Sequence, residues 1–424
     1  MQMSSFASSC PCCPATEPPR DCVEEIVPGF TDEEQTWCDD KHLSLDQPKV
    51  IKHLDPDMNN DPEYVSRLAT NYGCCSSFRV LSDDGIKMMD HAVQSIEKHA
   101  VCSPRIPKVL RGGTFRSKFL NGMGHSAAVL RQVSQLTGCE MVYHPMKIQQ
   151  LHINFKPNDD PNEVAGSKKN VDRWHCDTTP FVLIVFATDP DEYTGGELQY
   201  FQGTREEGVA LLSSGAGLPA DRVLNVGRQE KGYGVLMQGW RVFHQVTAVL
   251  TGDERTTLVY SFQPRNVLAL EACTHLSQTY NKVDPLHIFM PDWARYRAWK
   301  VVRRYELCAE HLPADVTLLR GAALLDGADT AQVTPLSAAV SASCTLLAHI
   351  VDTLAYTDDR EVLTGLLREA IAPVKTLLQD GSVQASAAFH DSAFGLANLR
   401  GGVEDIDNAI EDILTLKDSG MEYY

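Results

Sequence analysis

The sequence predicts an α+β protein whose core is an antiparallel barrel or jelly roll, with helices before and after it in the chain. Between residues 142 and 262, short runs alternate apolar and polar side chains and are separated by Gly, Asp, Asn or Pro. No helical crossover pattern lies between these runs, which favours antiparallel pairing. A chain of 424 residues with 43% hydrophobic side chains is long enough to bury a sizeable core.

We therefore divide the chain into three parts. Residues 1–80 are rich in Pro, Asp, Cys and Asn and are expected to form an irregular N-terminal segment. Residues 81–272 are expected to form the barrel domain with its supporting helices. Residues 273–424 are rich in Ala and Leu and are expected to form a helical C-terminal extension.

Charge and cysteine usage narrow the class of protein. A net charge of -18 argues against nucleic-acid binding, because phosphate contacts need clustered Lys and Arg. The 13 cysteines are scattered and odd in number, which predicts reduced thiols of an intracellular protein. The CPCCP stretch (Cys10, Cys12, Cys13) lacks a second ligand pair and is interpreted as incidental rather than as a zinc site. With no signal-peptide or membrane-span pattern, we expect a cytoplasmic protein.

Two amphipathic helices are expected before the strand region. In SDDGIKMMDHAVQSIEKHA, an acidic cap precedes apolar residues at helical spacing, namely Ile86, Met89, Ala92, Val93 and Ile96. HSAAVLRQVSQLTG predicts a second helix that ends at Gly138. Both should support the barrel domain.

The strand region itself contains the runs KIQQLHINF, PFVLIVFAT, GGELQYF, KGYGVLMQ, RVFHQVTAVL and RTTLVYSF. Residues 202–226 interrupt them without a firm strand pattern, so a loop over the mouth of the barrel is expected there. After Pro291, amphipathic stretches predict helices that are broken at Pro373 and at Gly381. Their expected role is packing, including a homodimer contact, rather than substrate binding.

A His-x-Asp pair in RWHCDTTPF is the first candidate for chemistry. Because side chains alternate along a strand, His175 and Asp177 are expected on one face of it. A third ligand, His244, lies 69 residues on in another run and would complete a facial triad for a divalent metal ion. The same spacing at His53 and Asp55 lies in a Pro- and Asn-rich stretch and is interpreted as a solvated turn.

A basic residue follows the distal histidine. Arg255 lies eleven residues after His244, and Thr257 is expected on the same strand face. A buried arginine is costly unless an anion meets it. A dicarboxylate would satisfy Arg255 with one end and chelate the metal with the other.

Together, WHCDTTPF, TGGELQYF and FHQVTAVLTGDERTTLVYSF resemble the iron(II)- and 2-oxoglutarate-dependent dioxygenases, and most closely their prolyl-4-hydroxylase-like branch. The resemblance covers about residues 146–263. It implies a double-stranded β-helix, cupin-like core, with iron(II), 2-oxoglutarate and O2 as cofactor and co-substrates. It also implies that His175, Asp177 and His244 are the catalytic iron ligands, and that Arg255 and Thr257 bind 2-oxoglutarate. Thr257 stands where part of the family has Ser, and the hydroxyl is retained.

Other polar residues near these motifs are secondary candidates. In KIQQLHINF, an extended strand would place Gln150, His152 and Asn154 on one face. They would bind substrate or 2-oxoglutarate, with Asn154 assigned to the latter, or would satisfy one another. Arg173 and Arg241 flank the ligands and are candidates for an anionic substrate, although solvated arginines are commoner.

The aromatic and sulfur neighbours of the ligands have simpler alternatives. Trp240 is a further substrate candidate, but both Trp174 and Trp240 are equally compatible with packing. Cys176, between the two proposed ligands, is interpreted as an apolar filler.

The resemblance implies oxidation of an unactivated C–H bond, with succinate and CO2 as co-products. We expect a small-molecule substrate, since the chain is acidic and shows no peptide-recognition repeat. Hydroxylation is the default reaction, and oxidative ring closure, as in the kainoid synthases of algae, is a specific variant. The alternatives are a peptidyl or protein prolyl-type hydroxylase and, from another class, a non-catalytic barrel that binds a metal or ligand.

Overall fold

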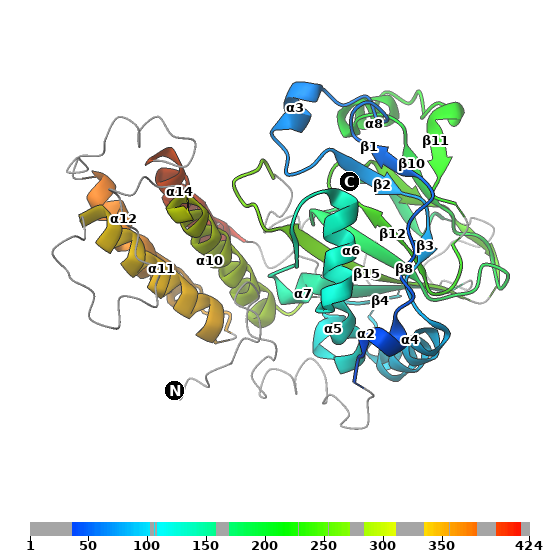
Figure 1. The fold of residues 1–424 in the computed structure, drawn as a ribbon, viewed down its shortest axis with the longest axis horizontal. Coiled ribbons are helices and arrows are strands. Elements are labelled where there is room, and N and C mark those ends of the chain that lie inside the picture. The colour runs from blue at the N-terminus through cyan, green and yellow to red at the C-terminus, as the bar shows by residue number, and fades with distance from the viewer. Residues whose placement is uncertain are drawn as a thin grey trace. The chain divides into compact units, whose positions relative to one another are not determined.

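The longest strand, β15 (Glu254–Pro264), lies inside an antiparallel sheet around which one half of the structure is built (Figure 1). The computed structural model describes residues 36–101, 106, 108–157, 169–227, 229–252, 254–271, 284–310, 335–355, 357–379 and 396–416. These residues divide into two compact units. The sheet unit contains residues 36–265 and 269–284, and the helical unit contains residues 266–268 and 285–416.

The large sheet of the sheet unit is antiparallel throughout. Its strand order is β1 (Ile51–His53), β2 (Tyr72–Cys75), β12 (Tyr233–Met237), β8 (Phe181–Phe186), β15, β6 (Leu151–Pro157) and β4 (Lys108–Leu110). Off this path, β3 (Phe78–Arg79) pairs with β12 and β5 (Met141–Tyr143) pairs with β15.

A smaller antiparallel sheet faces the large one. Its order is β11 (Val223–Asn225), β10 (Leu198–Phe201), β13 (His244–Val246) and β7 (Asp172–His175). The short strands β14 (Val249–Thr251) and β9 (Thr194–Gly195) form a separate pair. Side chains from β8, β12 and β15 share one buried cluster with side chains from β10, so the two sheets pack face to face.

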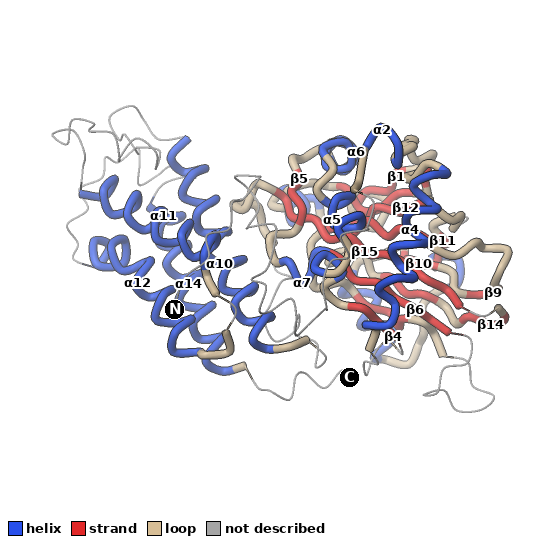
Figure 2. The backbone as a smooth tube through the Cα atoms, turned by 90° about the horizontal axis from the view of Figure 1, so that it is seen from below, coloured by secondary structure: helices blue, strands red, loops and turns tan. Residues whose placement is uncertain are grey.

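Helices cover the opposite face of the large sheet: α4 (Asp83–Ile96), α5 (Lys118–Gly124) and α6 (Ala127–Thr137) (Figure 2). Each begins where a serine hydroxyl accepts a hydrogen bond from a backbone N–H of the first turn, at Ser82, Ser117 and Ser126. The helix α6 ends at Gly138, whose φ of 71° is a left-handed conformation that suits glycine. The two helices predicted here from sequence are therefore confirmed.

Strand alternation assigns each side chain of the central strands to one of two environments. On β8, Phe181, Leu183 and Val185 pack against the helices, whereas Val182 and Ile184 face the smaller sheet. β15 divides in the same way, with Leu258 on the helical side. One face of the large sheet thus packs against the helices, and the other packs against the smaller sheet and lines a cavity between them.

Shorter helices complete the sheet unit. They are α2 (Asp39–His42), α3 (Pro62–Ser66), α7 (Lys147–Gln150) and α8 (Arg205–Ser213), with single 3-10 turns at Glu97–His99, Gly113–Phe115 and Ala220–Arg222. The helix α8 lies in the segment between β10 and β11. It is held there by two ion pairs, Arg241 to Glu206 and Arg222 to Glu207.

The helical unit consists of α10 (Leu286–Glu310), α11 (Pro335–Thr353), α12 (Arg360–Gln379) and α14 (Leu396–Thr415). Packing joins α10 to α11 and α14, and α12 to α11 and α14. Ion pairs from Arg297 and Arg304 to Asp405 link α10 with α14. None of the helices in the described ranges is long and apolar enough to cross a membrane. The homodimer contact expected for these helices stays a prediction.

The antiparallel sheets and helices confirm the α+β class, while the double-stranded β-helix topology stays a prediction. The irregular character expected for residues 1–80 is wrong for residues 51–79, which supply β1, β2 and β3. These strands have only two to four residues each, which is too short to show a period of two. Residues 1–35, including CPCCP, lie outside the described residues, as does Gly381.

Two further local expectations are corrected. The expected break at Pro373 is wrong, because α12 runs through this residue to Gln379. Residues 202–226 are not only a loop, because they contain α8 and β11. In α8 the helical pattern is weak, since its apolar residues do not gather on one face.

Replacement of Leu258 by alanine is expected to destabilise the sheet unit by about 2–5 kcal/mol, because this side chain is fully buried between the sheet and its helices. The matched control is Leu250→Ala on β14, where the residue is 57% exposed and the expected change is within about 0.5 kcal/mol. Urea denaturation of the two variants and the wild type measures both values. Equal effects would contradict the assignment of the core face.

Candidate metal centre and its cavity

A cavity of about 330 Å³ lies between the large and small sheets. The large sheet lines it through β6, β8 and β15, and the small sheet through β7, β10 and β13. Its polar lining residues are Arg111, Gln149, His152, Asn154, Asp172, His175, Asp177, Thr178, Thr179, Arg205, His244, Arg255 and Thr257. Most of the candidate residues predicted from sequence therefore line one cavity.

His175 and His244 face each other across neighbouring strands. In the antiparallel pairing of β7 with β13, these two residues are direct partners. Their ring centroids lie 4.2 Å apart. Residues 69 positions apart in the sequence are thus brought together by strand register.

Asp177 joins them from just beyond the strand. β7 ends at His175, so the expectation that both residues lie in one strand is wrong. The Asp177 backbone N–H instead donates to the Gly239 carbonyl at 2.9 Å. Its Oδ1 lies 3.4 Å from His175 Nε2 and 3.7 Å from His244 Nε2. One ligand atom from each of the three residues lies within 4.8 Å of the others, so the group can hold a metal ion.

Backbone carbonyls orient both imidazoles. His175 Nδ1 lies 2.6 Å from the Arg173 carbonyl oxygen, and His244 Nδ1 lies 2.8 Å from that of Val242. A carbonyl only accepts, so each Nδ1 donates and each Nε2 keeps its lone pair for a metal ion. Burial, together with the nearby His175, lowers the pKa of His244 to about 4, which keeps its ring neutral at pH 7.

Gly239 makes room for the carboxylate ligand. A Cβ atom at this position would lie 2.0 Å from Asp177 Oδ2, which is closer than any two such atoms can approach. Its carbonyl also accepts the hydrogen bond from the Asp177 backbone. Glycine is therefore required beside the metal group, and sequence reasoning missed this residue because the contact is not local.

Asp172 is a second carboxylate near the histidines that sequence reasoning missed. Its Oδ2 lies 3.5 Å from His175 Nε2, and the residue lines the cavity. A register shift in the pairing of β7 with β13 separates Asp172 from the regular ladder. The alternation rule alone could not place an i, i+3 pair on the same side of a strand.

Arg255 is buried in the same cavity, with only 2% of its surface exposed. Its Nη2 donates to the amide oxygen of Gln229 at 2.8 Å, and its Nε has no hydrogen-bond partner among the described residues. Burial lowers the pKa of the guanidinium, and Tyr193 and the nearby charge of Glu197 oppose this shift. Gly196 leaves space for this side chain, since a Cβ there would lie 2.6 Å from Arg255 Cδ.

Three polar residues lie around Arg255 on the floor of the cavity. Thr257 is paired directly with Asn154 across β15 and β6, and Val259 is paired with His152. Asn154 Oδ1 is buried and has no hydrogen-bond partner in the described part of the chain. Thr257, Asn154 and His152 all line the cavity, as the alternation on β6 and β15 predicts.

Four other residues singled out from the sequence lie elsewhere. Gln150 belongs to α7 rather than to β6, and its side-chain amide donates to the His144 carbonyl at 2.8 Å. Arg173 is exposed, and Trp240 is buried in the core between the sheets. Arg241 donates to Glu206 and to Asn60, so it anchors α8 instead of facing the cavity. The substrate-binding roles suggested for these four residues receive no support from their positions.

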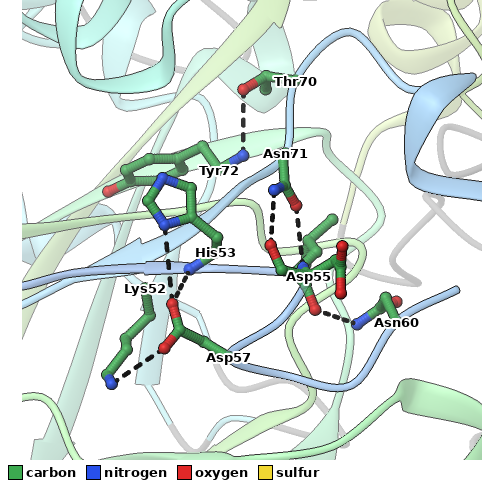
Figure 3. Close-up of polar contacts among 9 residues, drawn as sticks. Lys52, His53, Asp55, Asp57, Asn60, Thr70, Asn71 and Tyr72 are labelled. Atoms are coloured by element: carbon green, nitrogen blue, oxygen red, sulfur yellow. Dashed lines mark hydrogen bonds and ion pairs between the residues drawn. The ribbon is translucent and has the colours of Figure 1, made fainter. Parts of the chain in front are cut away.

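The second His-x-Asp pair is part of a turn (Figure 3). The backbone N–H of His53 donates to Asp57 Oδ2 at 2.8 Å, and Lys52 forms an ion pair with Asp57. The backbone of Asp55 exchanges two hydrogen bonds with the side chain of Asn71. The polar groups around this pair thus fix the loop after β1 and bring no third ligand to it.

No protein-family model matches the sequence, and no curated protein matches it. A search of solved structures matches the chain to the epimerase SnoN from nogalamycin biosynthesis, among others; SnoN is described as non-heme and α-ketoglutarate dependent. It is 15% identical, covers 48% of this chain and 84% of its own, and gives a TM-score of 0.35.

Two further structures give similar values. HygX from Streptomyces hygroscopicus, with nickel and 2-oxoglutarate bound, is 13% identical over 48% of this chain and 87% of its own (TM-score 0.33). A Pseudomonas putida prolyl-4-hydroxylase is 15% identical over 48% and 98% (TM-score 0.32). The function of this chain has to follow from the residues of its own site.

Replacement of Gly239 by alanine is expected to weaken metal binding about 10- to 100-fold, because the added methyl group displaces the Asp177 carboxylate. Titration with cobalt(II), followed by its visible absorption, measures the affinity. The control is Gly365→Ala in α12, where a Cβ would meet nothing within 4 Å. Unchanged affinity in a folded Gly239→Ala protein would show that Asp177 is not a ligand.

Proposed function

We propose that this protein is an iron(II)- and 2-oxoglutarate-dependent oxygenase, built on a double-stranded β-helix, that oxidises an unactivated C–H bond of a small molecule. The overall reaction converts R–H, 2-oxoglutarate and O2 into R–OH, succinate and CO2. The observation that carries the proposal is that a His–Asp–His group and a buried arginine share one cavity.

The donor set fits iron(II). Two imidazole nitrogens and one carboxylate oxygen form a 2-His-1-carboxylate group, which leaves coordination positions open for substrates. Iron(II) bound there would supply the activation of O2. His175 and His244 would hold it through Nε2, with the Nδ1 bonds fixing both rings, and Asp177 would bind through its carboxylate.

Arg255 and Thr257 would hold the distal carboxylate of 2-oxoglutarate. The arginine is buried, with Gln229, Tyr193 and the charge of Glu197 near it, and the pKa of its guanidinium is still lowered by burial. A bound anion would compensate this desolvation. A guanidinium binds a carboxylate through two parallel hydrogen bonds, and the Thr257 hydroxyl lies two residues further along the same strand face. Asn154, opposite Thr257, would offer its amide to the same co-substrate.

The cavity favours a small molecule over a peptide chain. A volume of about 330 Å³ lies within the range of small-ligand sites, and Arg205 of α8 contributes to its wall. Apolar side chains from β8 and β13 line the rest of the cavity, beyond Arg255 and the proposed metal ligands. Such a lining suits a substrate with a hydrocarbon skeleton. Hydroxylation adds one oxygen to such a substrate, whereas ring closure or desaturation removes two hydrogens.

Replacement of His175 by alanine is expected to reduce 2-oxoglutarate-dependent succinate formation to background and to abolish tight iron(II) binding, since a facial site cannot lose one of three ligands. The matched control is His53→Ala, in the loop that carries the same His-x-Asp spacing. Succinate is measured with iron(II), O2 and metabolite extracts, and the extracts are screened by mass for oxygen gain or hydrogen loss. If the wild type neither forms succinate nor binds 2-oxoglutarate, a non-catalytic barrel replaces this proposal.

Replacement of Arg255 by glutamine is expected to weaken 2-oxoglutarate binding about 100-fold, because a charge-assisted, bidentate contact is lost. The discriminating comparison uses 2-oxopentanoate, which has the same chain length but no distal carboxylate. Wild-type protein with nickel(II) should prefer 2-oxoglutarate strongly, and the Arg255→Gln variant should not distinguish the two acids. Arg67→Gln, at an exposed position, serves as control. A preference that survives in Arg255→Gln would place the distal carboxylate elsewhere.

A further inference from the structure

We propose that Arg205 binds an oxyanion of the primary substrate, so that the substrate is a small organic anion with an apolar skeleton. This inference rests on the proposed function, because that function assigns Arg255 to 2-oxoglutarate. The shared chemistry is a carboxylate or a phosphate ester, either of which accepts hydrogen bonds from a guanidinium.

Of the three arginines in the cavity lining, one is available to bind the substrate. Arg111 forms two hydrogen bonds with the carboxylate of Asp284, at 3.1 and 3.0 Å, and is neutralised by it. Arg255 is assigned to 2-oxoglutarate. Within the described ranges, no carboxylate lies at ion-pair distance from Arg205, although this residue lines the cavity. With Arg255 assigned to 2-oxoglutarate, Arg205 is therefore the cavity arginine without a carboxylate partner in the described part of the chain.

The neighbours of Arg205 fix its position without satisfying its charge. Arg241 donates a hydrogen bond to the carboxylate of Glu206. Arg222 donates two to the carboxylate of Glu207, with N···O distances of 2.6 and 2.7 Å. Thr204 caps the first turn of α8 by accepting from the Glu207 backbone N–H. A capped helix held by two ion pairs thus carries Arg205 to the cavity lining, and its exposure makes it accessible to an incoming ligand.

The remaining wall suits the rest of such a substrate. Val182, Ile184, Leu198, Val246 and Val259 come from both sheets and form the apolar part of the lining. An anionic group held at Arg205 would therefore leave the hydrocarbon part of the molecule inside the cavity that contains the metal ligands. In contrast, Asp172 and Asp177 are negative and would disfavour an oxyanion at the histidine end in the absence of a metal ion.

The experiment uses the full chain with nickel(II) and 2-oxoglutarate, which do not turn over. Binding of hexanoate, hexyl phosphate and the neutral hexanamide is measured by calorimetry. The wild type should bind one of the anions at least about tenfold more tightly than the amide. Arg205→Gln should weaken that anion about 10- to 100-fold and leave the amide unchanged, while Arg205→Lys should retain part of the preference.

The matched control is Arg131→Gln, at an exposed position on α6, which removes the same charge from the other side of the large sheet. It should bind all three compounds as the wild type does. The favoured anion identifies the oxyanion as carboxylate or phosphate. No preference for an anion, or a preference that Arg205→Gln keeps, would overturn this inference alone. Failure of the wild type to bind 2-oxoglutarate in the same titration would instead overturn the proposed function.

Discussion

The antiparallel pairing of β7 with β13 is the constraint on which the site depends. It makes His175 and His244 direct partners, so that two imidazoles meet at the wall of the cavity, with His244 buried and His175 partly exposed. Two charged rings at 4.2 Å would repel each other, and burial keeps at least His244 neutral. The arrangement is thus suited to a metal cation. The carbonyls of residues 173 and 242, each two positions before a histidine, then direct both rings toward the same point.

The part of the fold that follows from a period of two was predictable from sequence. Alternation on β6 and β15 placed His152, Asn154, Arg255 and Thr257 on one wall, and the structure has them there. Gln150 failed the same rule because Lys147–Gln150 closes into a helical turn before the strand begins. The rule assumes a continuous extended chain, and it fails at the residue where the extended conformation starts.

The residues that sequence reasoning missed act through contacts between distant segments. Gly239 matters because of where Asp177 lies, and Asp172 reaches His175 only because the ladder is irregular there. Arg241 shows the opposite case, in which a residue close to a candidate ligand in sequence lies outside the site. It flanks the metal ligand in sequence, yet its partners Asn60 and Glu206 come from two other segments. Proximity along the chain to a candidate ligand therefore does not by itself place a side chain in the site.

The strands of residues 51–79 tie the metal group to the N-terminal part of the chain. β2 pairs with β12 at Cys74 and Met237, and the Gly73 carbonyl accepts a hydrogen bond from the next backbone N–H, that of Gln238. Gln238 directly precedes Gly239, against which the Asp177 carboxylate rests. The segment that carries the three candidate ligands therefore depends on residues 51–79 for its geometry. Transplanted without residues 51–79, it would keep the ligands' identities and lose the support that sets the geometry of one of them.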